Sequence, residues 1–104
     1  EQLKLLSCQK NSIPKIENLV SLPNLIYLDL YDNHIREIEN LHTIPTLRVV
    51  MLSKNKIQKI KNLEFLTKLE VLDLHSNTIE TIEGLSTNKN MKILNLSNNR
   101  IKCI

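Results

Sequence analysis

The sequence predicts an α/β solenoid, a right-handed leucine-rich superhelix with a parallel β-sheet on its concave side and short helical or 3₁₀ segments on its convex side. Three observations lead to this prediction: leucines, asparagines and isoleucines each recur every 22 residues along the 104-residue chain. A fixed period of this size is the signature of stacked repeats. The chain holds about four and a half such repeats, which begin at Leu3, Leu25, Leu47, Leu69 and Met91.

A short strand is expected near the start of each repeat. In "YLDL" (27–30) the side chains of Leu28 and Leu30 point to one face, and those of Tyr27 and Asp29 point to the other. Strands of successive repeats then pair in parallel. One repeat cannot bury its own apolar face, so stacking is needed to build a continuous core.

An asparagine follows every strand at the point where the chain must leave the sheet. That turn leaves backbone N–H and C=O groups without strand partners. An Asn amide has a donor end and an acceptor end, so it can satisfy these groups and also bond to the neighbouring repeat. The expected members of this asparagine ladder are Asn11, Asn33, Asn55, Asn77 and Asn99.

The rest of each repeat is a return segment that carries inward-pointing isoleucines and leucines. Two isoleucine series fill it: Ile13, Ile35, Ile57, Ile79 and Ile101, and Ile16, Ile38, Ile60, Ile82 and Ile104. Asn88 interrupts an apolar position that Leu22, Ile44 and Leu66 occupy in the other repeats. We therefore expect the fourth return segment, "GLSTNKNMK", to be irregular or more exposed than the others.

Composition narrows the class of protein. The net charge is +3, and basic residues are interspersed with acidic ones, which favours a solvated surface over a nucleic-acid patch. No apolar run approaches the roughly 18 residues of a membrane span.

Cys8 and Cys103 lie about four repeats apart, too far for a disulfide, and are expected to be the reduced thiols of an intracellular protein. Both terminal repeats carry the same apolar positions as the middle ones, so 1–104 is expected to be a leucine-rich domain from a longer protein that includes its caps.

The form LxxLxLxxN is that of a leucine-rich repeat. With "IENL" at 16–19 and 38–41 and "IEGL" at 82–85, the chain resembles the 22-residue intracellular subfamily typified by a regulatory subunit of protein phosphatase 1. That subfamily includes an axonemal dynein light chain, a subunit of the tubulin polyglutamylase complex and a spliceosomal protein. The resemblance implies a non-enzymatic scaffold that binds partners on its concave face. It also implies that the contacts come from the variable strand positions between the leucines.

The concave face can also be read from the residues alone. In a parallel sheet, equivalent positions lie about 4.8 Å apart, so residues 22 apart are neighbours. They form an apolar column beside a polar one, and tyrosine and methionine on such a surface are typical of protein interfaces. The candidate partner-binding residues are Tyr27, Asp29, Tyr31, Asp32, Val49, Met51, Lys54, Val71, Asp73, His75 and Asn95.

A catalytic or metal site is the alternative to a protein-binding face, and the residues do not support it. Asp73 and His75 point outward from one strand, but no nucleophile, glycine-rich loop or third orienting group accompanies them. Asp29, Asp32 and His34 are close in sequence, but His34 follows the ladder asparagine and should point away from the concave face. We expect no enzyme activity, metal or cofactor.

A lysine-rich stretch, "KNKIQKIKNL" (54–63), remains open to two interpretations. It contains Lys54, Lys56, Lys59 and Lys61 within one repeat. A solvated surface is the simpler interpretation. Contact with an acidic surface, such as a tubulin tail or RNA, is the functional one.

The sequence therefore favours a regulatory or adaptor subunit that holds other proteins. The expected setting is a cytoplasmic complex associated with microtubules or cilia, with tubulin or dynein-type proteins as partners. The alternatives are a regulatory subunit that binds the phosphatase 1 catalytic subunit, and a nuclear RNA-processing protein of the spliceosomal type. Neither a small-molecule substrate, a membrane nor direct nucleic-acid binding is expected.

Overall fold

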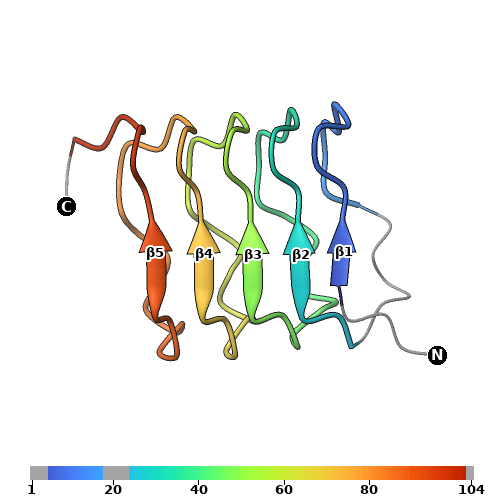
Figure 1. Ribbon diagram of the computed structural model, residues 1–104. Coiled ribbons are helices and arrows are strands. Elements are labelled where there is room, and N and C mark those ends of the chain that lie inside the picture. Colours follow the sequence, from blue (N-terminus) through green and yellow to red (C-terminus); the bar gives the residue numbers. More distant parts are fainter. Residues whose placement is uncertain (1–4, 18–23, 103–104) are drawn as a thin grey trace.

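One parallel sheet, with its strands in chain order, forms the front of the molecule (Figure 1). The computed structural model describes residues 5–17 and 24–102. Each strand pairs with the next at the residue 22 positions further on, so that Tyr27 lies beside Val49 and Val49 beside Val71. The predicted solenoid and its period are confirmed. The strands are β1 (Leu5–Ser7), β2 (Tyr27–Asp29), β3 (Val49–Met51), β4 (Val71–Asp73) and β5 (Ile93–Asn95).

The core lies behind the sheet and is made of the repeated apolar positions. In the second repeat, Leu28, Leu30 and Ile35 are buried, as are their counterparts in the third. Cys8 takes the place of a strand leucine and packs half-buried against this core, as its position predicts. Cys103 lies outside the described residues, so the distance between the two cysteines stays a prediction.

The asparagine ladder is present and continuous. Asn55 accepts a hydrogen bond at Oδ1 from the backbone N–H of Ile35, at 3.0 Å. Its Nδ2 donates to the carbonyl oxygens of Leu30 and Leu52, both at 3.0 Å. Asn33, Asn77 and Asn99 repeat this arrangement one turn apart.

The strand-end carbonyl groups of the second, third and fourth repeats each serve two ladder asparagines. Leu30 O accepts from Nδ2 of Asn33 and of Asn55, and Leu52 O accepts from Nδ2 of Asn55 and of Asn77. A carbonyl oxygen has two lone pairs and can accept both bonds. The ladder therefore ties neighbouring repeats together as well as closing the turn within each one.

The return segments differ from the prediction of short helical or 3₁₀ pieces: the described ones are made of turns. In the second repeat, the N–H of Ile44 bonds to Leu41 O at 3.0 Å, and the N–H of Leu47 bonds to Ile44 O at 3.3 Å. These two bonds start three residues apart, whereas a helix needs bonds from consecutive residues. The described chain accordingly has no helix long and apolar enough to cross a membrane.

The fourth return segment is expected to be irregular or more exposed, and it is more exposed: Leu85 and Met91 are partly exposed, whereas Leu63 and Leu69 at the same positions of the third repeat are buried. Its turns, however, are regular. Asn88 is 5% exposed, and its segment makes the same two turn bonds as the others, from Asn88 N to Leu85 O and from Met91 N to Asn88 O. The side chain fits because its Nδ2 donates to the carbonyl oxygens of Leu63 and Leu66, at 3.0 and 3.1 Å. Its Oδ1 has no hydrogen-bond partner among the described residues.

Left-handed backbone recurs at two positions of the repeat. One precedes the ladder asparagine and is occupied by Lys10, Asp32, Lys54, Ser76 and Asn98. The other begins the return segment, where Asn40, Asn62 and Gly84 have φ of 63°, 62° and 72°. The side chains of Asn40 and Asn62 donate to carbonyl groups of the preceding repeat, namely Ile16 O and Ile38 O.

Gly84 fills this second position without a side chain, and its backbone lies close to the preceding repeat. A Cβ atom built there would stand 2.6 Å from the carbonyl oxygen of Ile60. Changing Gly84→Ala should therefore lower the free energy of unfolding by about 1–3 kcal/mol, through both the left-handed φ and the close contact. Urea denaturation measures this loss.

Glu83→Ala is the control for that change, because Glu83 is exposed and adjacent. Its effect should stay within about 0.5 kcal/mol. Equal unfolding midpoints for the two variants would contradict the assigned close contact at Gly84.

Candidate functional site

The concave face carries three columns of outward side chains, because the strands pair in register. The first column is apolar and consists of Leu5, Tyr27, Val49, Val71 and Ile93. Its two ends are the most open, with Leu5 54% and Ile93 57% exposed. The three middle members are half-buried by their neighbours. The column is thus a continuous apolar strip across all described strands.

The second column, which includes Asp29, Asp73 and Asn95, is mainly polar. These three side chains form local hydrogen bonds that the repeat pattern did not predict. Asp29 Oδ1 accepts the backbone N–H of Tyr31 at 3.1 Å, and Asp73 Oδ1 accepts that of His75 at 3.1 Å. Asn95 makes the same bond to Ser97 N, also at 3.1 Å. A side chain that bonds to the N–H two residues on is a turn-forming Asx arrangement. The signal available in the sequence was an Asp or Asn at the middle position of "LxL", two residues before the N–H that it accepts.

The two aspartates are therefore not equally free to bind a partner. The second oxygen of Asp29 lies 3.4 Å from Nε2 of Gln9. Among the described residues, Asp73 Oδ2 has no such contact. Of the two aspartates in this column, Asp73 is the one with an oxygen available to a cationic or hydrogen-bonding group.

The third column combines large and small side chains. Tyr31 and His75 are partly exposed, and Ser53 between them is 2% exposed. Lys54, at the edge of the column, places its Nζ 5.6 Å from the centre of the Tyr31 ring, within the range of a cation–π contact. His75 Nδ1 lies 3.0 Å from Ser76 Oγ.

All eleven predicted partner-binding residues are at least partly exposed on or beside this face. The structure brings the Nζ of Lys54, in the third repeat, over the ring of Tyr31 in the adjacent second repeat. It does not bring His34 to Asp29: His34 lies on the segment that leaves the sheet, where its backbone N–H bonds to Ile13 O. Within the described ranges, no group of three His, Cys, Asp or Glu side chains is arranged to hold a metal ion.

Stacked strand-and-turn repeats, an in-register parallel sheet and a buried asparagine ladder together define a solenoid protein with an open sheet face. The model for leucine-rich repeats in two copies matches residues 1–41, 45–87 and 67–104. The chain belongs to the leucine-rich repeat family, whose domains are generally protein-binding scaffolds and typically non-catalytic. The comparisons do not single out one subfamily.

Three solved structures illustrate the similarity. An internalin of Listeria monocytogenes is 31% identical with a TM-score of 0.89, and the match covers 98% of this chain and 30% of that one. A Leptospira interrogans leucine-rich repeat protein is 30% identical with a TM-score of 0.86, covering 93% and 26%. The Drosophila melanogaster SNF/U2A′ complex contains a chain that is 27% identical with a TM-score of 0.82, covering 93% and 59%.

This chain thus spans less than two thirds of each of those three proteins. A search of curated proteins finds no match.

Proposed function

We propose that this protein is a non-enzymatic adaptor or regulatory subunit that binds a protein partner on its concave face. The observation that carries the proposal is the in-register apolar column from Leu5 to Ile93, beside a column with a free carboxylate oxygen on Asp73. An apolar strip next to sparse polar groups is the composition of a protein interface core and rim. Tyrosine is enriched among the residues that dominate binding energy, and the face presents both tyrosines of the chain.

The proposed setting is a cytoplasmic complex associated with microtubules or cilia, with tubulin or dynein-type proteins as partners. This part of the proposal is supported by the resemblance of the "IENL" repeats to the intracellular 22-residue subfamily. A nuclear RNA-processing role is the second candidate, supported by the similarity to the Drosophila melanogaster SNF/U2A′ complex. Regulation of the phosphatase 1 catalytic subunit is the third, supported by the same "IENL" resemblance.

The test uses a concave variant in which each new residue already occurs at the same position of another repeat. Tyr27→Val follows Val49 and Val71, Tyr31→Ser follows Ser53, and Asp73→Asn follows Asn95. These changes keep the strand register and the Asx bond to residue 75 but remove the aromatic rings and the charge. Captured partners are identified by mass spectrometry from cytoplasmic and nuclear extracts, and recovery with the concave variant should fall at least about tenfold.

The matched control carries three changes on the convex turns, chosen by the same rule: Glu64→Ser, Phe65→Thr and Lys68→Asn. Its thermal unfolding and that of the concave variant should remain cooperative, and its partner recovery should match that of the unchanged protein. Equal recovery with the concave variant would exclude the concave face as the binding site. The identity of the lost proteins then separates the cytoskeletal, phosphatase and RNA-processing candidates.

A further inference from the structure

A second surface of the molecule, the segments that leave the sheet after each ladder asparagine, is as regular as the sheet itself. We call residues 34–37, 56–59, 78–81 and 100–102 the descending flank. Their backbones stack in register: the N–H groups of Lys56, Thr78 and Arg100 bond to Ile35 O, Ile57 O and Ile79 O at 2.8, 3.0 and 2.9 Å. Side chains 22 apart therefore lie beside one another here as they do on the concave face.

The descending flank carries cations that lack partners. Glu37 pairs with Lys61 at 3.4 Å, and Glu80 pairs with Lys102 at 3.8 Å. None of the ion pairs formed within residues 5–17 and 24–102 includes Arg36, Lys56, Lys59 or Arg100, and all four side chains are exposed. The acidic groups of the flank are thus already neutralised, and positive charge is left over.

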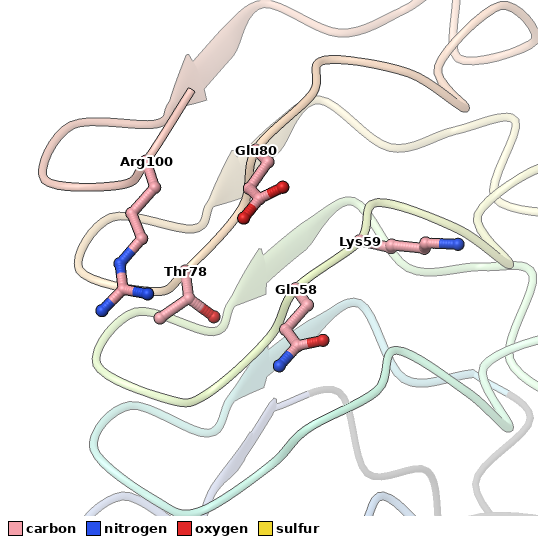
Figure 2. Close-up of a pocket in the computed structure, with 5 residues that line it drawn as sticks. All are labelled: Gln58, Lys59, Thr78, Glu80 and Arg100. Carbon is pink, nitrogen blue, oxygen red and sulfur yellow. The ribbon is translucent and has the colours of Figure 1, made fainter. Parts of the chain in front are cut away.

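Two hollows lie among these residues, one on each side of the third repeat. The larger, of about 240 Å³, is lined by Gln58, Lys59, Thr78, Glu80 and Arg100. Figure 2 shows the polar ends of Arg100, Thr78 and Gln58 turned to the same side of the flank, while Lys59 extends in another direction.

The smaller hollow, of about 190 Å³, is lined by Arg36, Glu37, Gln58, Lys59 and Lys61. The two hollows share Gln58 and Lys59, so they adjoin each other along the flank.

We propose that the descending flank binds an extended acidic peptide segment of a protein partner, with carboxylate side chains entering the two hollows. An extended peptide turns alternate side chains, about 6.6 Å apart, to one side, so two of its carboxylates can enter adjoining hollows. An arginine guanidinium is suited to a carboxylate because it offers two parallel N–H donors. The side-chain amide of Gln58 can donate to the same groups, whereas the Thr78 hydroxyl already donates to Ile57 O at 3.1 Å.

Features of this surface favour a peptide over RNA. The chain has no Trp, both tyrosines lie on the concave face and Phe65 lies on a return segment, so His34 is the one aromatic ring of the described flank and gives no row of rings on which to stack successive bases. Glu37 and Glu80 interrupt the positive charge, which disfavours a continuous phosphate backbone. Separate carboxylates can avoid these positions.

The test measures binding of a fluorescein-labelled twelve-residue glutamate-rich peptide by fluorescence anisotropy. The flank variant Arg36→Gln with Lys59→Thr changes two residues that line the hollows and uses the residues found at the same positions of other repeats, Gln58 and Thr81. The control variant Lys68→Asn with Lys89→Thr removes the same charge from exposed return-segment positions. The flank variant should weaken binding about five- to thirty-fold, because exposed charge contacts are individually modest. The control variant should change it less than about two-fold.

Three results would overturn the proposal. The first is no saturable binding of the peptide to the unchanged protein at 50 mM salt. The second is that the flank and control variants weaken peptide binding equally, which would mean that only the net charge of the protein matters. The third is that a twelve-nucleotide oligouridylate binds the unchanged protein more tightly than the peptide does, and that the flank variant abolishes this RNA binding. That result would assign the surface to nucleic acid. The concave variant should bind the peptide as tightly as the unchanged protein does. The experiment therefore tests this proposal independently of the proposed function.

Discussion

Asn55→Ala should lower the free energy of unfolding by about 2–4 kcal/mol. The amide of Asn55 is 7% exposed and makes hydrogen bonds to the second and third repeats. Leu30 O and Leu52 O keep a second donor, from Asn33 and Asn77, after the change. The N–H of Ile35 does not, and an unsatisfied buried donor costs about 1–3 kcal/mol in addition to the lost bonds. Urea denaturation followed by circular dichroism measures the change.

Asn11→Ala is the matched control, because Asn11 occupies the same position of the first repeat but is exposed. Its Nδ2 donates to Gln9 O, a group that water can reach. The expected loss is less than about 1 kcal/mol. If the two substitutions were equally costly, the asparagine would matter for local turn conformation and not for satisfying buried groups.

Leu72→Ala should cost still more, about 3–5 kcal/mol. Leu72 is fully buried at the centre of β4, between Val50 and Leu94 of the adjoining strands. Truncation removes apolar area and leaves a cavity that the flanking repeats cannot fill. A drop in the urea midpoint with little change in slope is the expected observation.

Leu94→Ala provides the comparison for that substitution within the same row of the sheet. Leu94 is only partly buried because β5 is the last described strand. A cost of about 1–2 kcal/mol is expected, since less apolar surface is lost. In a protein held together by contacts between adjacent repeats, a change in the fifth repeat should also loosen that repeat more than the distant ones. Hydrogen exchange resolves this local effect.

The period made most of the fold predictable, because it assigns each residue type to one physical task. An apolar residue at 28, 50 or 72 has to be inside, and an asparagine at 33, 55 or 77 is the residue that can close a buried turn. The three columns of the concave face followed from the same arithmetic and are present. Which of these residues touch a partner stays a prediction, since register shows position and not affinity.

The errors came from contacts between repeats that no single position reveals. Asn88 is a polar residue at an apolar position, and its presence predicts an irregular or more exposed segment, whereas the segment keeps regular turns and Asn88 itself is buried. Its burial depends on the carbonyl groups of Leu63 and Leu66, which the preceding return segment places within hydrogen-bond distance of its amide. Likewise, a return segment of turns and one of short helix have similar apolar spacing, so the sequence did not distinguish them. The aspartates at 29 and 73 were assigned to binding alone, although each also holds its own turn.

The shared carbonyl groups of the asparagine ladder limit how such a chain can change length during evolution. Asn55 reaches back 20 residues to the N–H of Ile35 and 25 residues to the carbonyl group of Leu30. Insertion of one residue between Leu52 and Asn55 would displace the amide from both repeats at once. An insertion in a convex turn can bulge outward as a longer loop, and duplication of an entire 22-residue unit would leave every bond of the ladder intact. Changes in length that keep the molecule folded are therefore confined to the convex turns or to whole units.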